Sequence, residues 1–457
     1  MTNYHFVGIG GIGMSALARI LRARGERVTG SDVNETPLIA RLREEGIDVT
    51  AGHDARNVGA ATTVVVSSAI ERRNPEYAAA RRLGVPVLHR GEMLARLVND
   101  RRGIAICGTH GKTTTTAMVH TVLRMSGVDA TLALGGIDGV LGTNAYDGAS
   151  PWFVTEADES DGSFALLEPE IAVVTNIEND HLTSDDELPQ LVRAFGEFLA
   201  KLPDAGIAII GADNALSASL LDHDLRAAST SFGFHPDAHL RAVNVRCAGL
   251  SASFDVAAGG VCLGNVELRV PGEINVLNAL AAVAVARRLD IPFARIAAAL
   301  HAFGGVRRRF DILARSERMI VVDDYAHHPT AVRATIEAAR QYHGGPVVVA
   351  FQPHRYTRTA FLAREFAAAL RGADRVYLAP VYAASEAPMP GVSERSIGEP
   401  LASDGGDVRY VGAVGDLERR LLDEAPEGAV VLMLGAGNIT DVAARLAGRV
   451  NTAGVVS

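Results

Sequence analysis

Several residue types are scarce in this chain, and their scarcity excludes some classes of protein. Of 457 residues, three are cysteine and one is tryptophan, and aromatic residues make up 5%. Cys107, Cys247 and Cys262 are widely spaced, which fits neither a disulfide framework nor a zinc-binding pattern. We therefore expect buried thiols in a reducing cytoplasm.

Long apolar runs and a basic character are also absent. No apolar stretch reaches the ~18 residues of a transmembrane helix, and the N-terminus lacks the features of a signal peptide. Acidic residues outnumber basic ones by 53 to 44, which gives a net charge of −9. Nucleic-acid binding needs a basic face that displaces counterions, so this balance argues against it. We expect a cytoplasmic monomer or homodimer that binds neither nucleic acid nor membrane.

Lysine is almost missing. The 44 basic residues include only Lys112 and Lys201. Such a bias reflects genome composition, but an arginine cannot replace a compact ammonium in a tight loop. Lys112 stands within the glycine-rich run 108–113, where compactness matters, whereas Lys201 follows a helical stretch and is expected to be solvated.

Strand and helix signals alternate along the chain, which predicts parallel sheets with helices on both faces. A chain of 457 residues with 48% apolar content is long enough for about three domains, each with its own core. The polar stretch 99–103 has the composition of a linker, and a new unit begins near Asp311. We predict an α/β protein with an N-terminal Rossmann-like domain over 1–100, a central P-loop ATPase-type domain over 101–311 and a C-terminal Rossmann-like domain over 312–457.

A first glycine motif lies between the first predicted strand and helix. Residues 8–13 read GIGGIG and match G-x-G-x-x-G, and Asp32 ends the next strand about 20 residues on. Glycines at these positions let the backbone approach a diphosphate at a helix N-terminus. Two ligands remain open at this point, because NAD and a UDP-sugar carry the same diphosphate. The first would indicate an oxidoreductase.

A second glycine loop, residues 108–115, follows a short apolar strand and precedes a helix. Backbone N–H groups of such a loop bind nucleotide phosphates, its lysine adds positive charge, and the hydroxyl of Thr113 can hold Mg²⁺. Ile106 stands where the strict pattern has its first glycine, so the assignment depends on the strand–loop–helix context. The carboxylates at 156–161 suit Mg²⁺, and His181, which follows a later strand, is a candidate ligand of a second metal.

The third unit carries two polar loops at the ends of predicted strands, where open α/β sheets bind ligands. One loop is residues 323–329 and contains two histidines; the other is 352–358. Arg355 and Arg358 are three residues apart, so on a first helical turn they would share a face and grip a carboxylate.

Taken together, these motifs resemble the Mur ligase family of bacterial peptidoglycan synthesis. The markers occur in the family's order from Phe6 to about Ala447: HFVGIGGIGMS, VVVSSAI, GTHGKTTTT, EADESDGSF, VVTNIENDHL, GVRRRF, DDYAHHPTA, FQPHRYTRT and LGAGNI. The resemblance implies an N-terminal domain for a UDP-sugar, a central ATPase domain and a C-terminal domain for an amino acid. The spellings GIGGIGMS and EADESD favour the family member that adds L-alanine to UDP-N-acetylmuramate over the recycling member that attaches a tripeptide.

The resemblance also implies ligand contacts for individual residues. The UDP-sugar is expected at Gly10, Gly11, Ile12, Gly13, Met14, Ser15, Asp32, Ser67, Ser68 and Ala69. ATP is expected at Gly108, Thr109, His110, Gly111, Lys112, Thr113, Thr114, Asn275 and Asn278, with Arg308 or Arg309 at the γ-phosphate. The amino acid is expected at Tyr325, His327, Arg355 and Arg358, and Mg²⁺ at Thr113, Glu156 and His181. The implied catalytic residues are Lys112, His181 and His327.

The implied reaction is the ATP-dependent ligation of L-alanine to the lactyl carboxylate of UDP-N-acetylmuramate through an acyl phosphate. We expect the domains to close before the reaction, with hinges near residues 100 and 311. One residue departs from the family pattern G-x-H-N-x-x-N, because Ile274 replaces the histidine. We expect it to alter local support of the nucleotide or weaken its binding without abolishing activity. Outside the enzymes, the alternative is a regulatory protein that uses ATP as a switch.

Overall fold

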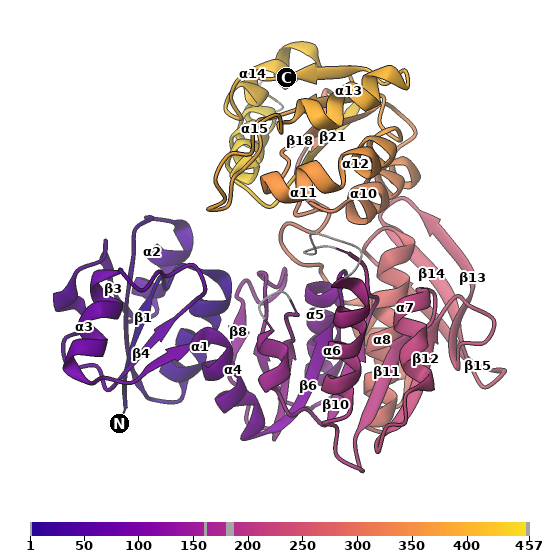
Figure 1. The fold of residues 1–457 in the computed structure, drawn as a ribbon. Helices are drawn as coiled ribbons and strands as arrows, with labels where there is room; N and C mark the ends of the chain where they lie inside the picture. Colours follow the sequence, from indigo (N-terminus) through magenta and orange to yellow (C-terminus); the bar gives the residue numbers. More distant parts are fainter. Residues whose placement is uncertain (1, 160–161, 180–186, 454–457) are drawn as a thin grey trace.

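The computed structural model describes residues 2–159, 162–179 and 187–453. Within these residues the strands form three separate sheets, and each sheet is the centre of one lobe (Figure 1). This arrangement agrees with the predicted α/β fold in three domains. No helix of the described residues is long and apolar enough to span a membrane.

The N-terminal sheet is entirely parallel, in the order β3-β2-β1-β4-β5. Its strands are β1 (Asn3–Val7), β2 (Arg27–Asp32), β3 (Asp48–Ala51), β4 (Thr63–Val66) and β5 (Val87–His89). The helices are α1 (Ile12–Ala23), α2 (Pro37–Glu44), α3 (Pro75–Leu83) and α4 (Arg90–Asn99), with a 3₁₀ turn at Ala55–Val58. Because β2, β1 and β4 are neighbours, the loops that follow them meet at one edge of the sheet.

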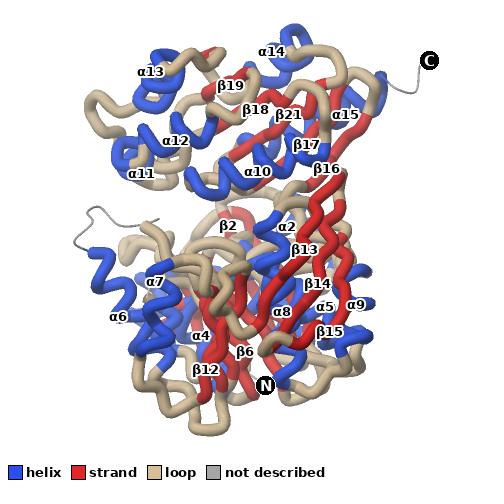
Figure 2. Tube along the Cα trace, turned by 90° about the vertical axis from the view of Figure 1, so that its right-hand side faces the viewer, coloured by secondary structure: helices blue, strands red, loops and turns tan. Residues whose placement is uncertain are grey.

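The central sheet has ten strands, in the order β15-β14-β13-β12-β11-β10-β6-β9-β7-β8. The strands from β13 to β7 in this order are parallel, while β8, β14 and β15 pair antiparallel. The strands are β6 (Arg102–Cys107), β7 (Thr131–Ala133), β8 (Ala145–Tyr146), β9 (Trp152–Glu156), β10 (Ile171–Val174), β11 (Ile207–Gly211), β12 (Ala228–Gly233), β13 (Leu240–Ala248), β14 (Ser251–Ala258) and β15 (Val261–Leu268). Figure 2 shows the hairpins β13–β15 extending along one side of this lobe.

Helices cover both faces of the central sheet. They are α5 (Lys112–Met125), α6 (Leu188–Leu199), α7 (Ala215–Ala218), α8 (Glu273–Arg288) and α9 (Phe293–His301), with 3₁₀ turns at Ser163–Leu166 and Ser219–Asp222. Helices α8 and α9 are consecutive but separate, and Pro292 is the N-cap residue of the second one. Helix α8 is buried along most of its length between the sheet and its neighbours.

The linker predicted over residues 99–103 is shorter in the structure. Helix α4 continues to Asn99 and β6 begins at Arg102, which leaves two residues between them. The Arg102 guanidinium lies 4.0 Å from the centre of the Trp152 ring and donates to both carboxylate oxygens of Glu170. The polar residues of this stretch thus lie at the exposed start of β6, where Arg102 is paired with Glu170 and packs on Trp152.

The C-terminal sheet follows the order β16-β17-β21-β18-β19-β20, with β16 antiparallel and the remaining strands parallel. The strands are β16 (Asp311–Arg315), β17 (Met319–Asp324), β18 (Val347–Phe351), β19 (Arg375–Leu378), β20 (Val408–Tyr410) and β21 (Ala429–Leu434). The helices are α10 (Pro329–Tyr342), α11 (Tyr356–Phe361), α12 (Ala363–Leu370), α13 (Arg395–Ser403), α14 (Asp416–Glu424) and α15 (Ile439–Ala453). The two predicted polar loops leave β17 and β18 at the same edge of this sheet.

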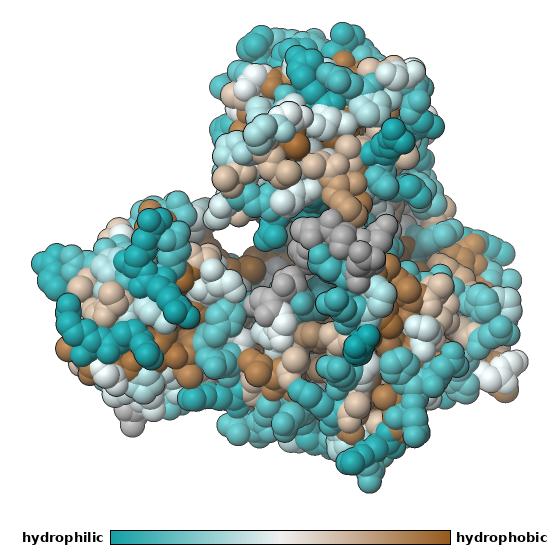
Figure 3. All heavy atoms as spheres, in the orientation of Figure 1, coloured by the Kyte–Doolittle hydropathy of each residue, from teal (hydrophilic) through white to brown (hydrophobic). Residues whose placement is uncertain are grey.

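The N-terminal lobe is fixed to the central lobe by buried polar contacts between α1 and the strand β8 region. Arg19, which is 8% exposed, donates to Asn144 and to both carboxylate oxygens of Glu45. The Asn144 amide in turn donates to the carbonyl of Ile12 and to the hydroxyl of Ser15. The N-terminal and C-terminal lobes themselves stand apart across a gap above the central lobe (Figure 3).

Of the three cysteines, only Cys107 is buried as predicted. Cys247 is half-buried and Cys262 is exposed, because both lie on the extended hairpins and not in a sheet interior. Burial raises the pKa of the Cys107 thiol, so this cysteine is protonated at neutral pH.

Candidate active site

A cavity of about 430 Å³ lies where the three lobes meet. It is lined by Gly13 and Arg90 of the N-terminal lobe, by the second glycine loop of the central lobe, and by residues of the two polar loops of the C-terminal lobe. The three predicted ligand sites therefore open into one space.

The second glycine loop connects β6 to α5 and points the N-terminus of α5 into this cavity. Gly108 and Gly111 have φ values of 118° and 85°, which favour glycine. A Cβ at Gly108 would lie 2.3 Å from the Thr175 hydroxyl, and one at Gly111 would lie 2.4 Å from the Asn278 side-chain oxygen. Both positions thus require glycine for space as well as for conformation. The backbone N–H groups at the start of α5 are the donors that an anion would meet.

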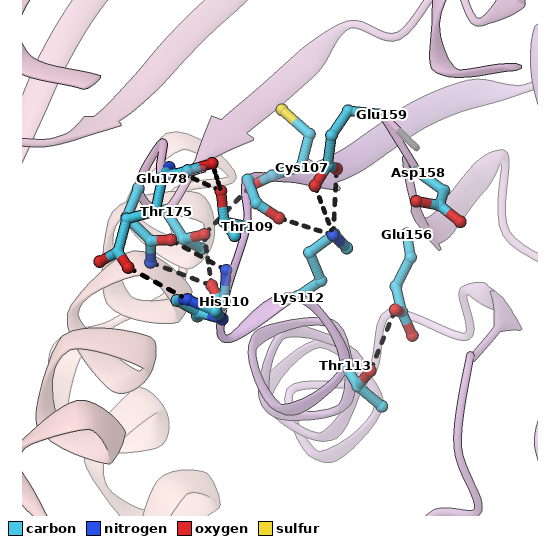
Figure 4. Close-up of polar contacts among 12 residues, drawn as sticks. Cys107, Thr109, His110, Lys112, Thr113, Glu156, Asp158, Glu159, Thr175 and Glu178 are labelled. Atoms are coloured by element: carbon cyan, nitrogen blue, oxygen red, sulfur yellow. Dashed lines mark hydrogen bonds and ion pairs between the residues drawn. The ribbon is translucent and has the colours of Figure 1, made fainter. Parts of the chain in front are cut away.

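Lys112 is held at the mouth of this loop (Figure 4). Its ammonium donates to the Gly108 carbonyl at 2.7 Å and to both carboxylate oxygens of Glu159 at 3.0 Å. Burial alone would lower the pKa of Lys112, but the charges of Glu159 and Asp158 outweigh burial and raise it. The lysine is therefore charged at neutral pH and fixed beside the loop that surrounds it.

Glu156 and Thr113 form an oxygen-rich corner beside the first turn of α5. The Thr113 hydroxyl donates to Glu156 Oε2 at 3.0 Å, and the Gly135 N–H donates to Glu156 Oε1 at 2.5 Å. Burial raises the pKa of Glu156 despite these donors and the nearby charge of Lys112. The buried Glu156 carboxylate and the Thr113 hydroxyl offer only oxygen atoms as metal ligands. Oxygen ligands suit a hard divalent cation such as Mg²⁺. His181, the third predicted metal ligand, lies outside the described residues.

The two candidate γ-phosphate arginines diverge. Arg309 lines the cavity, and its guanidinium donates to the Thr113 hydroxyl at 3.4 Å. Arg308 has a φ of 61° and turns away, donating to the Gly435 carbonyl at 2.7 Å. Both guanidinium groups lie near the ring of Tyr325, with their central carbons 4.9 Å (Arg308) and 5.0 Å (Arg309) from its centre. Of the pair, Arg309 faces the second glycine loop, here also called the phosphate loop, whereas Arg308 contacts the C-terminal lobe.

Asn275 and Asn278 also line the cavity, where they connect α8 to the phosphate loop. Asn278 accepts a hydrogen bond from Thr115 and donates to Asn275, which donates to the Pro271 carbonyl. Ile274 lies in the same turn of α8 and contributes an apolar side chain to the cavity wall. The two asparagines thus have structural partners in addition to any ligand.

In the N-terminal lobe, the predicted residues gather at the edge formed by β2, β1 and β4. Asp32 accepts the Gly10 N–H at 2.9 Å and the Asn34 N–H at 3.0 Å, so its carboxylate supports the glycine loop. Ile12 and Gly13 reach the cavity. Residues 67–69 follow β4 and are partly to fully exposed.

Met14 and Ser15 differ from this pattern because they lie on the inner face of α1. Both side chains are 2% exposed or less, and the Ser15 hydroxyl is bonded to the Ile12 carbonyl and the Asn144 amide. Their side chains are therefore part of the core and of the lobe interface, and only their backbone is left to contact a ligand.

The four predicted amino-acid-binding residues all line the cavity. His327 Nδ1 lies 2.8 Å from the Tyr325 carbonyl, which can only accept, so Nδ1 carries the proton and Nε2 is the basic nitrogen. Arg358 is 5% exposed and contacts His354 at 3.3 Å. We predicted that Arg355 and Arg358 would share a helical turn, and this prediction is wrong. Arg355 has a φ of 71° and precedes α11, so only Arg358 lies within the helix.

Sequence reasoning missed several residues that the structure brings to the site: Arg90, Glu159, Glu178, His328 and His354. Four of the five lie inside motifs that were already singled out, and Arg90 follows a strand at the ligand-binding edge of the N-terminal sheet. Position after a strand was thus the available signal. Which residue of each loop faces the cavity depends on packing between lobes and could not be read from spacing.

Comparison with known proteins agrees with this geometry. Three domain profiles match consecutive parts of the chain: "Mur ligase family, catalytic domain" at residues 3–102, "Mur ligase middle domain" at 106–286 and "Mur ligase, glutamate ligase domain" at 308–437.

Named relatives and solved structures cover nearly the whole chain. A UDP-N-acetylmuramate--L-alanine ligase of Carboxydothermus hydrogenoformans is 43% identical over 98% of this chain and 97% of its own length. One from Acidithiobacillus ferrooxidans is 45% identical over 96% of both chains. The crystal structure of UDP-N-acetylmuramate-alanine ligase from Thermotoga maritima has a TM-score of 0.86 at 32% identity, covering 99% of this chain and 100% of that one. A murein peptide ligase of Psychrobacter arcticus shares the fold, with a TM-score of 0.75 at 24% identity over 99% and 98%. The chain belongs to the Mur ligase family.

Proposed function

We propose that this protein uses ATP to join L-alanine to the lactyl carboxylate of UDP-N-acetylmuramate in peptidoglycan precursor synthesis. The observation that carries the proposal is the single cavity that Gly13, Lys112 and Arg358 line from three different lobes. Each lobe then presents one substrate to a common point. The relatives named for alanine addition are 43% and 45% identical, which favours alanine over the tripeptide of the recycling reaction.

Activation of the carboxylate is the task that ATP performs. A carboxylate does not acylate an amine in neutral water, so its oxygen first attacks the γ-phosphate, and ADP leaves. The alanine amine then attacks the acyl phosphate, and the tetrahedral intermediate expels phosphate. Two anions must approach each other in the first step, so the protein contributes mainly alignment and positive charge. Lys112, Arg309 and the N-terminus of α5 supply that charge.

Magnesium would be held by Thr113 and Glu156 and would neutralise phosphate oxygens when bound. His181 remains our predicted ligand for a second ion. The hydroxyl and carboxylate are already aligned at 3.0 Å in this structure, and the Arg309 guanidinium reaches the same hydroxyl.

The alanine site is proposed between β17 and β18. Arg355 and Arg358 would hold the alanine carboxylate, since both residues line the cavity. His327 Nε2 is unprotonated when Nδ1 donates to the Tyr325 carbonyl, so it can orient the ammonium and accept its proton.

The nucleotide base and the UDP-sugar are assigned to the remaining walls. Apolar side chains from two lobes face each other near the start of α8 and along α10, and we place the adenine between them: Val270, Pro271, Ile274, Ala334 and Ala338. The UDP-sugar diphosphate would lie at residues 10–13, at the N-terminus of α1, with Arg90 as an added cation. We place the domain boundaries near residues 100 and 311.

The proposed function is tested by coupled ADP release with UDP-N-acetylmuramate and a panel of amino acids plus the recycling tripeptide. Sustained ADP release over many turnovers should require ATP, the sugar acid and alanine together. Release with the tripeptide in place of alanine would assign the recycling reaction. ADP release that requires neither the sugar acid nor an amino acid would indicate a nucleotide switch. A change in fluorescence or melting temperature on addition of NAD would indicate an oxidoreductase.

Replacing Arg358 by alanine should raise the apparent KM for alanine about 100-fold, because a buried charge-assisted contact of about 3 kcal/mol is lost. The KM for ATP should change little, since Arg358 lies across the cavity on another lobe. Initial rates over an alanine series measure this effect. The matched control is Arg364→Ala, on the exposed side of the next helix. Equal increases in both KM values would contradict the placement.

A further inference from the structure

Behind the phosphate loop, three side chains from two lobes converge on a point outside the proposed Mg²⁺ corner. His110 belongs to the phosphate loop, Glu178 follows β10, and His328 is the N-cap residue of α10. Each offers one ligand atom, and these atoms all lie within 4.8 Å of one another. The His110 and His328 rings are 4.7 Å apart, and Figure 4 shows His110 directed at the Glu178 carboxylate.

One ring nitrogen of each imidazole lies near the Glu178 carboxylate. His328 Nε2 lies 3.2 Å from the Asn179 carbonyl, which can only accept, so the proton is on Nε2. Nδ1 then accepts the Thr330 backbone N–H at 3.4 Å, as the cap of α10, and lies 3.8 Å from Glu178 Oε2. A bound ion would take the place of that long hydrogen bond. His110 Nε2 is 3.3 Å from the same oxygen. This nitrogen is buried and makes no well-directed hydrogen bond to any described residue.

The carboxylate is ionised and held in place from the C-terminal lobe. The Thr330 hydroxyl donates to Glu178 Oε2 at 2.6 Å. Burial alone would raise the pKa of Glu178, but its contacts with His110, Thr330 and His328 outweigh burial and hold the pKa at about 2. Both imidazoles are at least 90% buried, with side chains 10% and 7% exposed.

We propose that His110, Glu178 and His328 form a binding site for a borderline divalent metal ion of the Zn²⁺ class. Two imidazoles and one carboxylate are ligands that Zn²⁺ accepts, whereas Mg²⁺ prefers oxygen alone. Three protein ligands leave one coordination position for water. The Asn179 carbonyl and the Thr330 hydroxyl are the supporting groups that commonly orient metal ligands.

The position of the site gives the ion a defined effect. Its ligands come from the central lobe and the C-terminal lobe, so a bound ion joins the phosphate loop to α10. His327, the proposed alanine-binding histidine, precedes His328 in the chain. Zn²⁺ would therefore stabilise the folded protein and oppose separation of the two lobes.

Co²⁺ is the probe, because its visible absorption distinguishes tetrahedral from octahedral coordination. The metal-free full chain, without nucleotide or substrates, should bind one Co²⁺ with an intense tetrahedral spectrum that Zn²⁺ abolishes by displacement. His328→Ala and Glu178→Gln should each weaken binding by more than about 100-fold, since loss of a supporting residue alone costs about 10- to 100-fold. The matched control is His301→Ala, which replaces a partly exposed histidine beside Glu267, and this variant should bind Co²⁺ as the wild type does.

Thr330→Val keeps all three ligands and removes only a supporting hydroxyl, so it should weaken Co²⁺ binding by about 10-fold. Melting curves in chelator identify any variant that fails to fold, and the Thr330 variant then carries the test. The proposal is overturned if the wild type shows no tetrahedral spectrum, or if Co²⁺ affinity is the same in wild type and in folded His328→Ala. Since no substrate is present, neither result bears on the ligase reaction.

Discussion

Replacing Lys112 by alanine should lower the rate of ligation by about 10³- to 10⁵-fold, the range seen when a positioned cation is lost from phosphoryl transfer. The ammonium is fixed by Gly108 and Glu159 and is charged at neutral pH. No other lysine lies nearby to replace it, because Lys201 is the one other lysine in the chain. Coupled ADP release measures the loss, and calorimetry should show that the UDP-sugar still binds. Near-normal turnover would remove the assigned role.

Stability must be separated from activity in this variant. Glu159 is 5% exposed, and loss of its partner leaves a buried charge unpaired, which costs about 3–5 kcal/mol. The double variant Lys112→Ala, Glu159→Gln removes that charge, so it should recover melting temperature without recovering ligation. Lys201→Ala is the matched single control and should be active.

Replacing Glu156 by glutamine should lower turnover by about 10²- to 10³-fold and raise the Mg²⁺ concentration needed for half-maximal rate. Gln keeps the shape and an acceptor for the Gly135 N–H but removes the charge that would hold the ion. Rates measured over a Mg²⁺ series test this expectation. The matched control is Glu168→Gln, an exposed carboxylate outside the cavity lining.

The same variant makes a prediction about stability with a definite sign. Because burial raises the pKa of Glu156, the folded state binds its proton more tightly than the unfolded state. Its contribution to stability is therefore present at low pH and lost as pH rises above the unfolded pKa. At neutral pH without Mg²⁺, Glu156→Gln should melt at the same or a higher temperature than the wild type. Added Mg²⁺ should raise the melting temperature of the wild type more than that of Glu156→Gln. Equal increases in the two proteins would contradict the assignment of Glu156 as a Mg²⁺ ligand.

The buried central strands were predictable from sequence, whereas the exposed edge strand β3 was not. The apolar runs at β4, β6, β10 and β17 are buried on both faces of parallel sheets, so they read as continuous apolar segments. The short strand β3 is mostly exposed and escaped prediction. We assigned Arg102 to a linker because its partner Glu170 is far along the chain. A local sequence pattern does not reveal such a pairing.

The candidate site was predictable to the level of loops. Glycine spacing and position after a strand identified each segment, because parallel strands bring their ends to one edge. The choice between Arg308 and Arg309 required the structure, since Arg309 contacts the Thr113 hydroxyl whereas Arg308 donates to the Gly435 carbonyl. The convergence of His110, Glu178 and His328 also depends on the docking of two lobes.

The scarcity of lysine has a practical consequence for chemistry on the intact protein. Acylating reagents that target primary amines meet an exposed Lys201 and a Lys112 side chain that is 17% exposed within an ion pair. Mass spectrometry of the peptide that contains Lys112 can therefore report how much of the phosphate loop is occupied, with Lys201 as the internal standard for reagent dose.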